Sequence, residues 1–481
     1  EEFRSLSIKE QKELKSLPKL KLPENYQYRD IPYSVDNTTK IFYPGLFQQP
    51  GLSCGQASAV SLMFAYEINR LRGVDGSLLT NQYPAGYAWN WENGGNGWYG
   101  VSYYHSFELL RSAGVPDIEL YGGTHGEGGG QRFMTGYDNY YEAMKNRIQN
   151  AYSIDCSNEE GINTVKHWLH NHLEDAETGG MAVFYSNYTN PNITLPSGTE
   201  NAGQTLITGW SPGSGHAMTI TGYNDSIRYD INNDGQYTNN IDINEDGIVD
   251  VKDWEIGGFK MNNTYATPYN SWMLYSSVAK DQHSNGGIWN KTINVVDAIE
   301  KYSPALTFKV DMYHTKRGEI KIMAGISTDL DAEVPEFYLN FPIFSYQGGD
   351  FGMQGGNTEE LRNIEFGLDV SPFLNIINPE TPVKFFLIVL SRPSGTSGNG
   401  HVNNFSLIDY TQNNPLEIIS DDTNVEIITN TATYLSVIHT PQFSKPEIIT
   451  ENLPHFLIGN QYSYNLIANH GEEPYRWEFD T

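Results

Sequence analysis

Cysteine is scarce in this sequence: only Cys54 and Cys156 occur among 481 residues. Two cysteines cannot supply the disulfide framework that stabilises small secreted domains, although one bridge between them stays open. The cysteine count therefore leaves the cellular compartment undecided. It also leaves two thiols that each need an explanation.

Basic residues and long apolar runs are also few. Lys and Arg number 30 against 58 Asp and Glu, which gives a formal net charge of -28. This charge argues against nucleic acid or an anionic membrane surface as the main partner, and it favours divalent cations. Because no run of 18 apolar residues occurs and the first residues are polar, we expect neither a membrane span nor a signal peptide in this chain. A signal already removed would leave the same sequence.

The chain is long enough for two or three domains, with 38% hydrophobic residues to fill their cores. Residues 1–30 are a charged lead-in. Residues 31–300 mix helical patterns at 57–72, 103–113, 137–150 and 160–173 with apolar, strand-like runs at 179–185 and 216–223, which predicts an α+β domain.

Helical patterns fade after residue 301. Short alternating runs at 318–327, 383–391 and 424–429 are separated by Gly, Asn, Asp and Pro, which predicts an all-β sandwich over 301–440. Prolines near residue 441 mark a further boundary, and 441–481 resembles the first strands of a partial Ig-like β module.

Cys54 precedes an amphipathic helix. Small or apolar residues recur on one face of the helix predicted at 57–72, at Ala57, Val60, Ser61, Phe64 and Ile68. A helix N-terminus carries partial positive charge, which favours a thiolate, so we expect a lowered pKa for Cys54. A small, inert, buried thiol is the alternative.

Two downstream residues favour the nucleophile. A glycine-rich loop leads to His216 at the first position of an apolar strand, and another apolar strand ends near Asn263. A thiol nucleophile needs a base, and the base needs a third group that orients its ring; Cys, His and Asn can fill these roles.

These residues resemble the active site of papain-like cysteine peptidases. The sequence "IPYSVDNTT" from Ile31 is similar to the mature start of that family, and Gln48 precedes Cys54 by the family's spacing for the oxyanion-hole glutamine. The resemblance implies a papain-like catalytic domain over about 31–280 and catalytic roles for Cys54, His216, Asn263 and Gln48. Gly55 replaces the family's tryptophan after the cysteine, and Tyr265 replaces the tryptophan that shields the His–Asn pair. These departures suggest a divergent bacterial branch.

The resemblance also implies a substrate and a location. "ENGGNGWYG" is similar to the family's glycine segment along the substrate cleft, where we expect Gly97 and Gly100 to line the path of an extended peptide. We therefore expect a secreted or cell-surface endopeptidase that acts on protein or peptide substrates. The C-terminal β modules could bind a cell surface or another protein.

An acidic insertion at 230–255 separates the segments that carry His216 and Asn263. It contains two successive Asp-x-Asn-x-Asp-Gly patterns, which are typical of EF-hand and dockerin calcium loops, where oxygen ligands at alternate positions surround Ca2+. The second pattern is complete, whereas the first has Ile241 at its twelfth position and is degenerate or shares Asp242. We expect structural Ca2+, with a metal-free, solvated hairpin as the alternative. The predicted ligands are Asp230, Asn232, Asp234 and Gln236 in the first loop, and Asp242, Asn244, Asp246, Ile248, Asp250 and Asp253 in the second.

A different function class remains open. A papain-like scaffold without strong activity could serve as a calcium-dependent binding or adhesion protein, with the acidic loops docking a partner. Cys156 has no visible base nearby and is predicted to be a bystander. His167, His170 and His172 are interpreted as a solvated helix face rather than a metal site.

Overall fold

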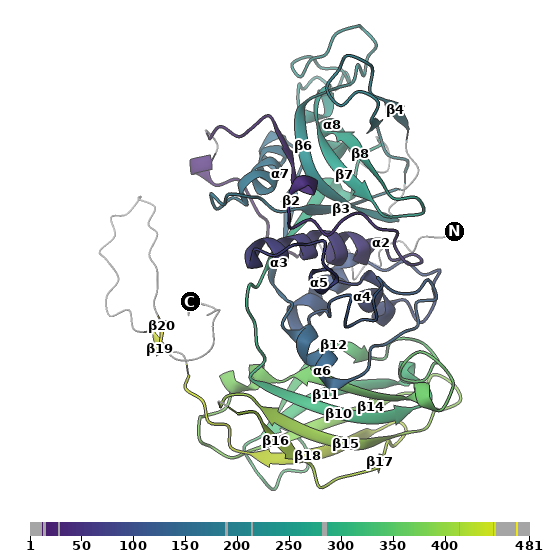
Figure 1. Cartoon of the computed structure of the whole chain (residues 1–481), viewed down its shortest axis with the longest axis vertical. Helices are drawn as coiled ribbons and strands as arrows, with labels where there is room; N and C mark the ends of the chain where they lie inside the picture. The colour runs from purple at the N-terminus through teal and green to yellow at the C-terminus, as the bar shows by residue number, and fades with distance from the viewer. Residues whose placement is uncertain are drawn as a thin grey trace.

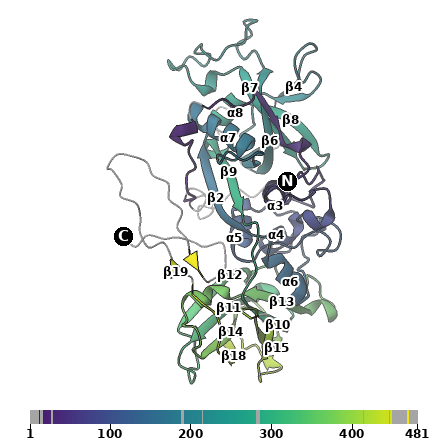
Figure 2. The ribbon, with the colours of Figure 1, turned by 60° about the vertical axis from the view of Figure 1, so that its left-hand side comes forward.

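The computed structural model shows a mixed α/β fold with several sheets (Figure 1). It describes residues 12, 16–26, 29–187, 191–212, 215–280, 286–412, 414–445, 447–448 and 468–469. A nine-stranded sheet lies at one end of the long axis and two further sheets lie at the other. Both views show helices α4, α5 and α6 between them (Figures 1 and 2). None of the described helices is long and apolar enough to cross a membrane.

One continuous helical segment carries Cys54. It consists of α2 (Cys54–Gln56), the π-helical η3 (Ala57–Phe64) and α3 (Ala65–Arg72). Residues 57–65 are buried on every side, so this helix lies inside the molecule. Gly73 ends it in the left-handed conformation, with φ of 64°. The helix predicted at 57–72 is confirmed and begins three residues earlier.

The remaining helices are mostly short. They are α4 (Ala85–Glu92), α5 (Tyr103–Ser112), α6 (Tyr137–Met144), α7 (Glu159–Asn171) and α8 (Tyr275–Ala279). Single 3-10 turns occur at η1 (Glu24–Tyr26), η2 (Asn37–Thr39), η4 (Leu79–Asn81), η5 (Val251–Asp253), η6 (Trp289–Lys291), η7 (Arg317–Glu319), η8 (Glu360–Arg362) and η9 (Ser371–Asn375).

The helical predictions at 103–113 and 160–173 are confirmed, and the one at 137–150 is wrong in its second half. There the helix ends at Met144 and strand β2 (Ile148–Asp155) begins, because pairing with a distant strand overrides the local pattern. Helix α4 was not predicted, since almost all of its residues are buried and its sequence shows no amphipathic period.

The nine-stranded sheet holds His216 and Asn263. Its spatial order is β2, β9 (Thr292–Ala298), β3 (Ala182–Ser186), β6 (His216–Arg228), β7 (Ile256–Asn263), β8 (Tyr269–Leu274), β5 (Thr205–Ile207) and β4 (Asn192–Thr194), with β1 (Ser34–Asp36) also paired to β6. Strands β6 and β7 are antiparallel, with Thr219 opposite Asn262. The start of β6 and the end of β7 therefore lie at the same edge.

The C-terminal part contains two antiparallel sheets. One has the order β13 (Asn363–Asp369), β10 (Leu306–His314), β15 (Gly400–Asp409) and β16 (Leu416–Ile419), with β17 (Val425–Glu426) also paired to β15. The other has the order β12 (Phe337–Ser345), β11 (Ile320–Ser327), β14 (Val383–Ser391) and β18 (Ala432–His439). The strands predicted at 318–327 and 383–391 are β11 and β14. We call this part, residues 305–440, the β region.

Beyond the β region, β19 (Glu447–Ile448) pairs with β20 (Ala468–Asn469). Residues 449–467 and 470–481 of the module predicted at 441–481 lie outside the described residues.

A single hydrophobic core joins the Cys54 helix to the β region. This cluster includes Cys54 and Phe64 from the helix together with Phe344, Phe366 and Val437 from the C-terminal sheets. Helix α5 contacts β12, and α6 contacts β13. A second core fills the space between the nine-stranded sheet and helices α7 and α8.

Candidate active site

Cys54 lies at the first turn of the buried helix, against the segment that carries His216. Its side chain is 3% exposed, and Sγ lies 3.8 Å from the carbonyl oxygen of Gly215. The backbone N–H of Ala217 also interacts with this sulfur. Cys54 Sγ therefore contacts the residues on both sides of His216 in the sequence.

His216 and Asn263 form a hydrogen-bonded pair at the edge of the sheet. His216 Nε2 lies 3.0 Å from Asn263 Oδ1, and both residues are buried. The Asn263 amide is itself fixed, because Oδ1 accepts the Tyr265 N–H at 2.9 Å and Nδ2 donates to the Tyr269 hydroxyl at 3.1 Å. The structure thus brings three of the four residues predicted to be catalytic into one cluster.

The Tyr265 ring lies beside the imidazole of His216. The ring centroids are 5.9 Å apart and the planes meet at 71°, an edge-on contact. This contact is compatible with the shielding role that the resemblance implies for Tyr265, and that role stays a prediction. Tyr269 was not predicted, since nothing in its local sequence distinguishes it from the other tyrosines.

Burial sets the protonation of the cysteine and the histidine. It raises the pKa of the Cys54 thiol to about 11, although the Ala217 N–H acts in the opposite direction. It lowers the pKa of His216 to about 4, although the bond to Asn263 favours the protonated ring. The expectation of a lowered pKa for Cys54 is therefore wrong, because loss of water around the thiolate outweighs the partial charge of the helix terminus. At neutral pH both the thiol and the imidazole are therefore neutral.

Gln48 lies in the loop before Cys54, and its neighbour Gln49 anchors that loop. Gln48 is exposed, whereas Gln49 is 5% exposed. The Gln49 N–H donates to the Thr264 carbonyl at 2.9 Å, and Gln49 Oε1 accepts the Thr264 hydroxyl at 2.9 Å. Because Thr264 follows Asn263, Gln49 ties the Gln48 loop to the end of β7. Sequence reasoning missed Gln49, since its partner is more than 200 residues away.

The glycine segment predicted to line the substrate path lies next to the Cys54 loop. A Cβ atom built on Gly51 would lie 2.8 Å from the Gly97 carbonyl oxygen, so the two backbones are in contact. Gly100 is buried, while Trp98 is 72% exposed at the tip of the loop. The position fits the predicted role of Gly97. The role itself stays a prediction.

Cys156 is a free, fully buried thiol that follows β2, and Cys54 is likewise free. The bridge between them that the sequence left open is therefore not formed. Burial raises the pKa of Cys156 above its ordinary value. An inert thiol agrees with the bystander interpretation.

The interpretation of the three histidines as a solvated face is wrong for two of them. His167 and His172 are buried, and His172 Nε2 lies 2.9 Å from the Glu67 carboxylate on α3. His167 instead packs edge-on against the Tyr26 ring, with ring centroids 5.4 Å apart. Neither residue therefore belongs to a solvated face.

The two acidic loops have the same local geometry. In the first, the Asp230 carboxylate accepts the N–H groups of Asp234 and Gly235. In the second, Asp242 accepts those of Asp246 and Gly247 in the same way. The oxygens at the first, third and fifth positions therefore lie on tight, repeated turns.

A buried carboxylate from downstream closes each acidic loop. Asp253 accepts the N–H groups of Ile243, Asn244 and Asp250, each at 3.0 Å. Glu255 accepts those of Ile231 at 2.6 Å and Thr238 at 2.9 Å, and so replaces the missing twelfth residue of the first loop. Sequence spacing could not identify Glu255, because it lies outside the twelve-residue pattern.

Lys252 forms ion pairs with two carboxylates of the second loop. Its Nζ contacts the Asp246 carboxylate and lies 3.1 Å from Asp250. Within the described residues, no group of three or more His, Cys, Asp or Glu side chains is arranged to hold a metal ion. Backbone N–H groups also donate to Asp242, Asn244 and Asp246, as they do to Asp253. The oxygens of these side chains are hard donors of the type that Ca2+ prefers.

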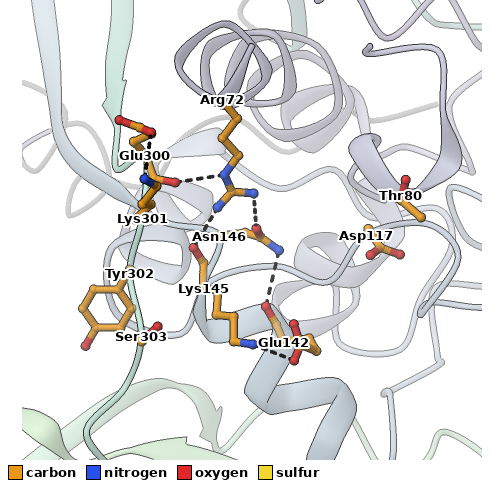
Figure 3. Close-up of a pocket in the computed structure, with 10 residues that line it drawn as sticks. All are labelled: Arg72, Thr80, Asp117, Glu142, Lys145, Asn146, Glu300, Lys301, Tyr302 and Ser303. Carbon is orange, nitrogen blue, oxygen red and sulfur yellow. Dashed lines mark hydrogen bonds and ion pairs between the residues drawn. The ribbon is translucent and has the colours of Figure 1, made fainter. Parts of the chain in front are cut away.

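A surface pocket of about 560 Å³ lies away from these residues (Figure 3). It is lined by Arg72, Asn146 and Glu300 among others, and Arg72 donates to the Glu300 carbonyl at 3.0 Å and to Asn146 Oδ1 at 2.8 Å. Arg72 ends the helical segment that Cys54 begins, so the pocket lies at the opposite end of that segment from the thiol. The pocket contains none of the predicted site residues.

Solved structures similar to this chain include three cysteine proteases. Xylellain from Xylella fastidiosa shares 12% identity at a TM-score of 0.36, over 59% of this chain and 91% of that one. ProCathepsin B S9 from Trypanosoma congolense shares 14% at 0.35, over 59% and 83%. The bromelain protease from Ananas comosus shares 12% at 0.34, over 55% and 99%.

No protein-family model matches the sequence, and no curated protein sequence matches it. At these identities and TM-scores, the similarities to solved structures by themselves establish neither an activity nor a substrate for this chain.

Proposed function

We propose that this chain is a papain-like cysteine endopeptidase. One observation carries the proposal: His216 Nε2 lies 3.0 Å from Asn263 Oδ1, while Cys54 Sγ contacts the residue before His216. A thiol, an imidazole and an amide that orients the imidazole are the groups that thiol-dependent acyl transfer needs.

Each residue has a chemical role in the proposed reaction. The Cys54 sulfur attacks the carbonyl carbon of the scissile peptide, and His216 takes the thiol proton and later gives it to the leaving amine. Asn263 holds the imidazole ring in position. The Gln48 amide and the Cys54 N–H at the start of the helix stabilise the developing oxyanion. Water then releases the acyl group.

Substitution of the cysteine tests this mechanism. Cys54→Ala should lower the hydrolysis of an unfolded protein substrate by at least about 10³-fold, because it removes the nucleophile. Gln48→Ala should lower kcat by about 10²-fold, the usual effect of one oxyanion donor. Asn263→Ala should be milder than Cys54→Ala, since it removes orientation only.

Cys156→Ala is the matched control and should keep wild-type turnover. A peptide epoxide should label the wild-type chain at Cys54 alone. Undiminished turnover in Cys54→Ala would contradict the proposal. A wild-type chain that binds unfolded protein but does not cleave it would favour the adhesion scaffold instead.

We further propose that the 230–255 insertion binds structural Ca2+. The support is the chemistry of the donor set: hard carboxylate and amide oxygens at the first, third and fifth positions of both loops, on the matching turns described above. In the second loop Ca2+ would replace the Lys252 ammonium beside Asp246 and Asp250. We also propose a secreted or cell-surface location, because extracellular modules bind Ca2+ through oxygen ligands of this kind.

Thermal melts with and without chelator test the calcium proposal. Ca2+ at a hundredfold its Kd should stabilise the folded chain by about 2.7 kcal/mol. Chelation should remove this stabilisation and increase proteolysis near Asn239. Asp246→Ala should abolish the shift, whereas Lys252→Met should keep or strengthen it because the competing cation is gone. Identical melts of the calcium-loaded and chelated protein would identify the insertion as a metal-free hairpin.

A further inference from the structure

Two glycine-rich segments form a wall beside the Cys54 loop. We call residues 93–100 and 126–131 the glycine wall. A Cβ atom on Gly51 would lie 2.8 Å from the Gly97 oxygen and 3.0 Å from the Gly128 oxygen, and one on Gly97 would lie 1.9 Å from the Gly128 oxygen. The wall is therefore backbone packed on backbone. The position of the glycine wall therefore depends on the segments that pack against it.

A loop of the β region provides that support. We call residues 346–356 the buttress loop. A Cβ atom on Gly95 would lie 2.5 Å from the Phe351 ring, and one on Gly349 would lie 2.3 Å from the Gly94 oxygen. A Cβ atom on Gly355 would likewise lie 2.0 Å from the Gln131 carbonyl oxygen. Both segments of the wall thus lie directly against the β region.

Arg317 joins the wall to the buttress loop. Its guanidinium donates to the carbonyl oxygens of Gly348 at 2.9 Å, Met353 at 3.3 Å and Gln131 at 2.6 Å, and it lies 3.6 Å from the centre of the Phe133 ring. Gly348 and Met353 belong to the buttress loop, and Gln131 belongs to the wall. One side chain therefore fixes three backbone positions across the boundary.

The burial of Arg317 is chemically unusual. The residue is 1% exposed, and its hydrogen bonds among the described residues go to carbonyl oxygens rather than to a carboxylate. Burial lowers the pKa of Arg317 to about 9. A buried charge without a counter-ion opposes folding, so its presence calls for a role beyond filling space.

The backbone that leads into the buttress loop is strained. Phe344 and Tyr346 have φ of 53° and 59°, in the left-handed region that residues other than glycine rarely adopt. Such conformations persist only where surrounding contacts enforce them, and they concentrate at functional positions. Here the Phe344 ring packs in the core against Trp91 and Phe366, and the Tyr346 N–H donates to the Ile320 carbonyl at 2.8 Å.

We propose that Arg317 and the buttress loop are positioning elements of the peptidase site, which hold the glycine wall where an extended substrate lies. The β region would then set how tightly the substrate binds, while the chemistry stays with the residues around Cys54. This inference rests on the proposed peptidase function.

The test compares two variants of the buttress with a control at the same boundary. Arg317→Met removes the three hydrogen bonds at similar side-chain volume, and Phe351→Ala removes the half-buried ring behind Gly95. Arg147→Met is the control, because Arg147 pairs with Asp369 across the same boundary at 2.7 Å but does not touch the glycine wall. The readouts are kcat and KM for a fluorogenic peptide, the rate of iodoacetamide labelling at Cys54, and hydrogen exchange of residues 93–100 and 126–131.

Both buttress variants should raise KM by about tenfold, with kcat and Cys54 labelling within about twofold of wild type, because only substrate positioning is lost. Exchange of the wall should become faster. Arg147→Met should lower the melting temperature without changing KM or exchange of the wall. Unchanged KM in both buttress variants, or an equal rise in KM in Arg147→Met, would overturn the inference.

Two outcomes separate this inference from the proposed function. If Arg317→Met does not fold, Phe351→Ala carries the test, since its ring is already partly solvent-exposed. If the wild-type chain cleaves no peptide, the peptidase proposal fails. Hydrogen exchange of the glycine wall in the buttress variants then shows by itself whether the buttress loop positions the wall.

Discussion

At the scale of single residues, the protonation of Cys54 and His216 is the least expected feature of the site. Both side chains are buried, which keeps the thiol protonated and the imidazole neutral over the physiological pH range. A preformed thiolate–imidazolium pair would need water or substrate dipoles that this arrangement excludes. The proton would therefore move to His216 as the thiol attacks.

The pH dependence of alkylation tests this view. In a Cys156→Ala background, the rate at which iodoacetamide labels Cys54 should rise about tenfold per pH unit between pH 7 and pH 10, because the thiolate fraction of a group with a pKa of about 11 rises in that proportion. Cys54→Ala gives the background rate. A plateau above pH 5 would instead indicate a stable ion pair.

At the scale of elements, a buried ionic cluster joins α3 to the end of α7. Burial alone would lower the pKa of His172, but the Glu67 and Glu174 carboxylates raise it to about 9. Burial likewise opposes ionisation of Glu67, yet His172 and Arg70 lower its pKa below the ordinary value. Asp297 lies 3.9 Å from His172 Nε2, the nitrogen that also contacts Glu67, and burial raises the pKa of Asp297.

This cluster predicts a loss of stability at alkaline pH. Because the pKa of His172 is higher in the folded chain than its unfolded value of about 6.5, its contribution is complete below pH 6.5 and disappears as the pH rises through about 9. The change should be at most roughly 3 kcal/mol, seen as a falling melting temperature between pH 6.5 and 9.5. His172→Gln should be less stable at pH 6.5 and should lose this slope.

His167→Gln is the matched control for the alkaline transition. His167 is buried on the same helix, but burial lowers its pKa to about 4, so it is neutral throughout this range. The variant should keep the wild-type slope. If His172→Gln also keeps it, the cluster does not govern the alkaline transition.

At the scale of the whole molecule, the part that carries the Cys54 helix and the β region share one interior. Trp91 on α4 lies 3.8 Å from Phe133 and 4.6 Å from Phe344, between ring centroids, and Phe344 lies 4.2 Å from Phe366 on β13. The same boundary contains the buried pair of Arg147 and Asp369. Neither part could separate without exposing apolar surface to water.

A shared core predicts that both parts unfold together. Calorimetry should show one transition, and Phe344→Ala should destabilise the whole chain by about 3–5 kcal/mol because it leaves a cavity in the common core. Tyr338→Ala, an exposed position on the same strand, should change stability by at most about 0.5 kcal/mol. Two resolved transitions, of which only one shifts in Phe344→Ala, would contradict the shared core.

The sequence by itself determined the features that depend on neighbouring residues. The helix after Cys54 follows from its apolar face, and the strand that begins at His216 follows from a buried apolar run after a glycine loop. The spacing of Asp and Asn likewise determined the repeated turns of the acidic insertion. These patterns are local, so they can be recognised without knowing what packs against them.

Only the tertiary structure decided the features that depend on burial and on distant partners. The raised pKa of Cys54, the anchor between Gln49 and Thr264, the pairing of His172 with Glu67 and the contact of Arg317 with Gln131 each join segments far apart in the sequence. The second half of the helix predicted at 137–150 became strand β2 for the same reason. Desolvation, packing and strand pairing are set by atoms from other elements, and no local pattern records which elements those are.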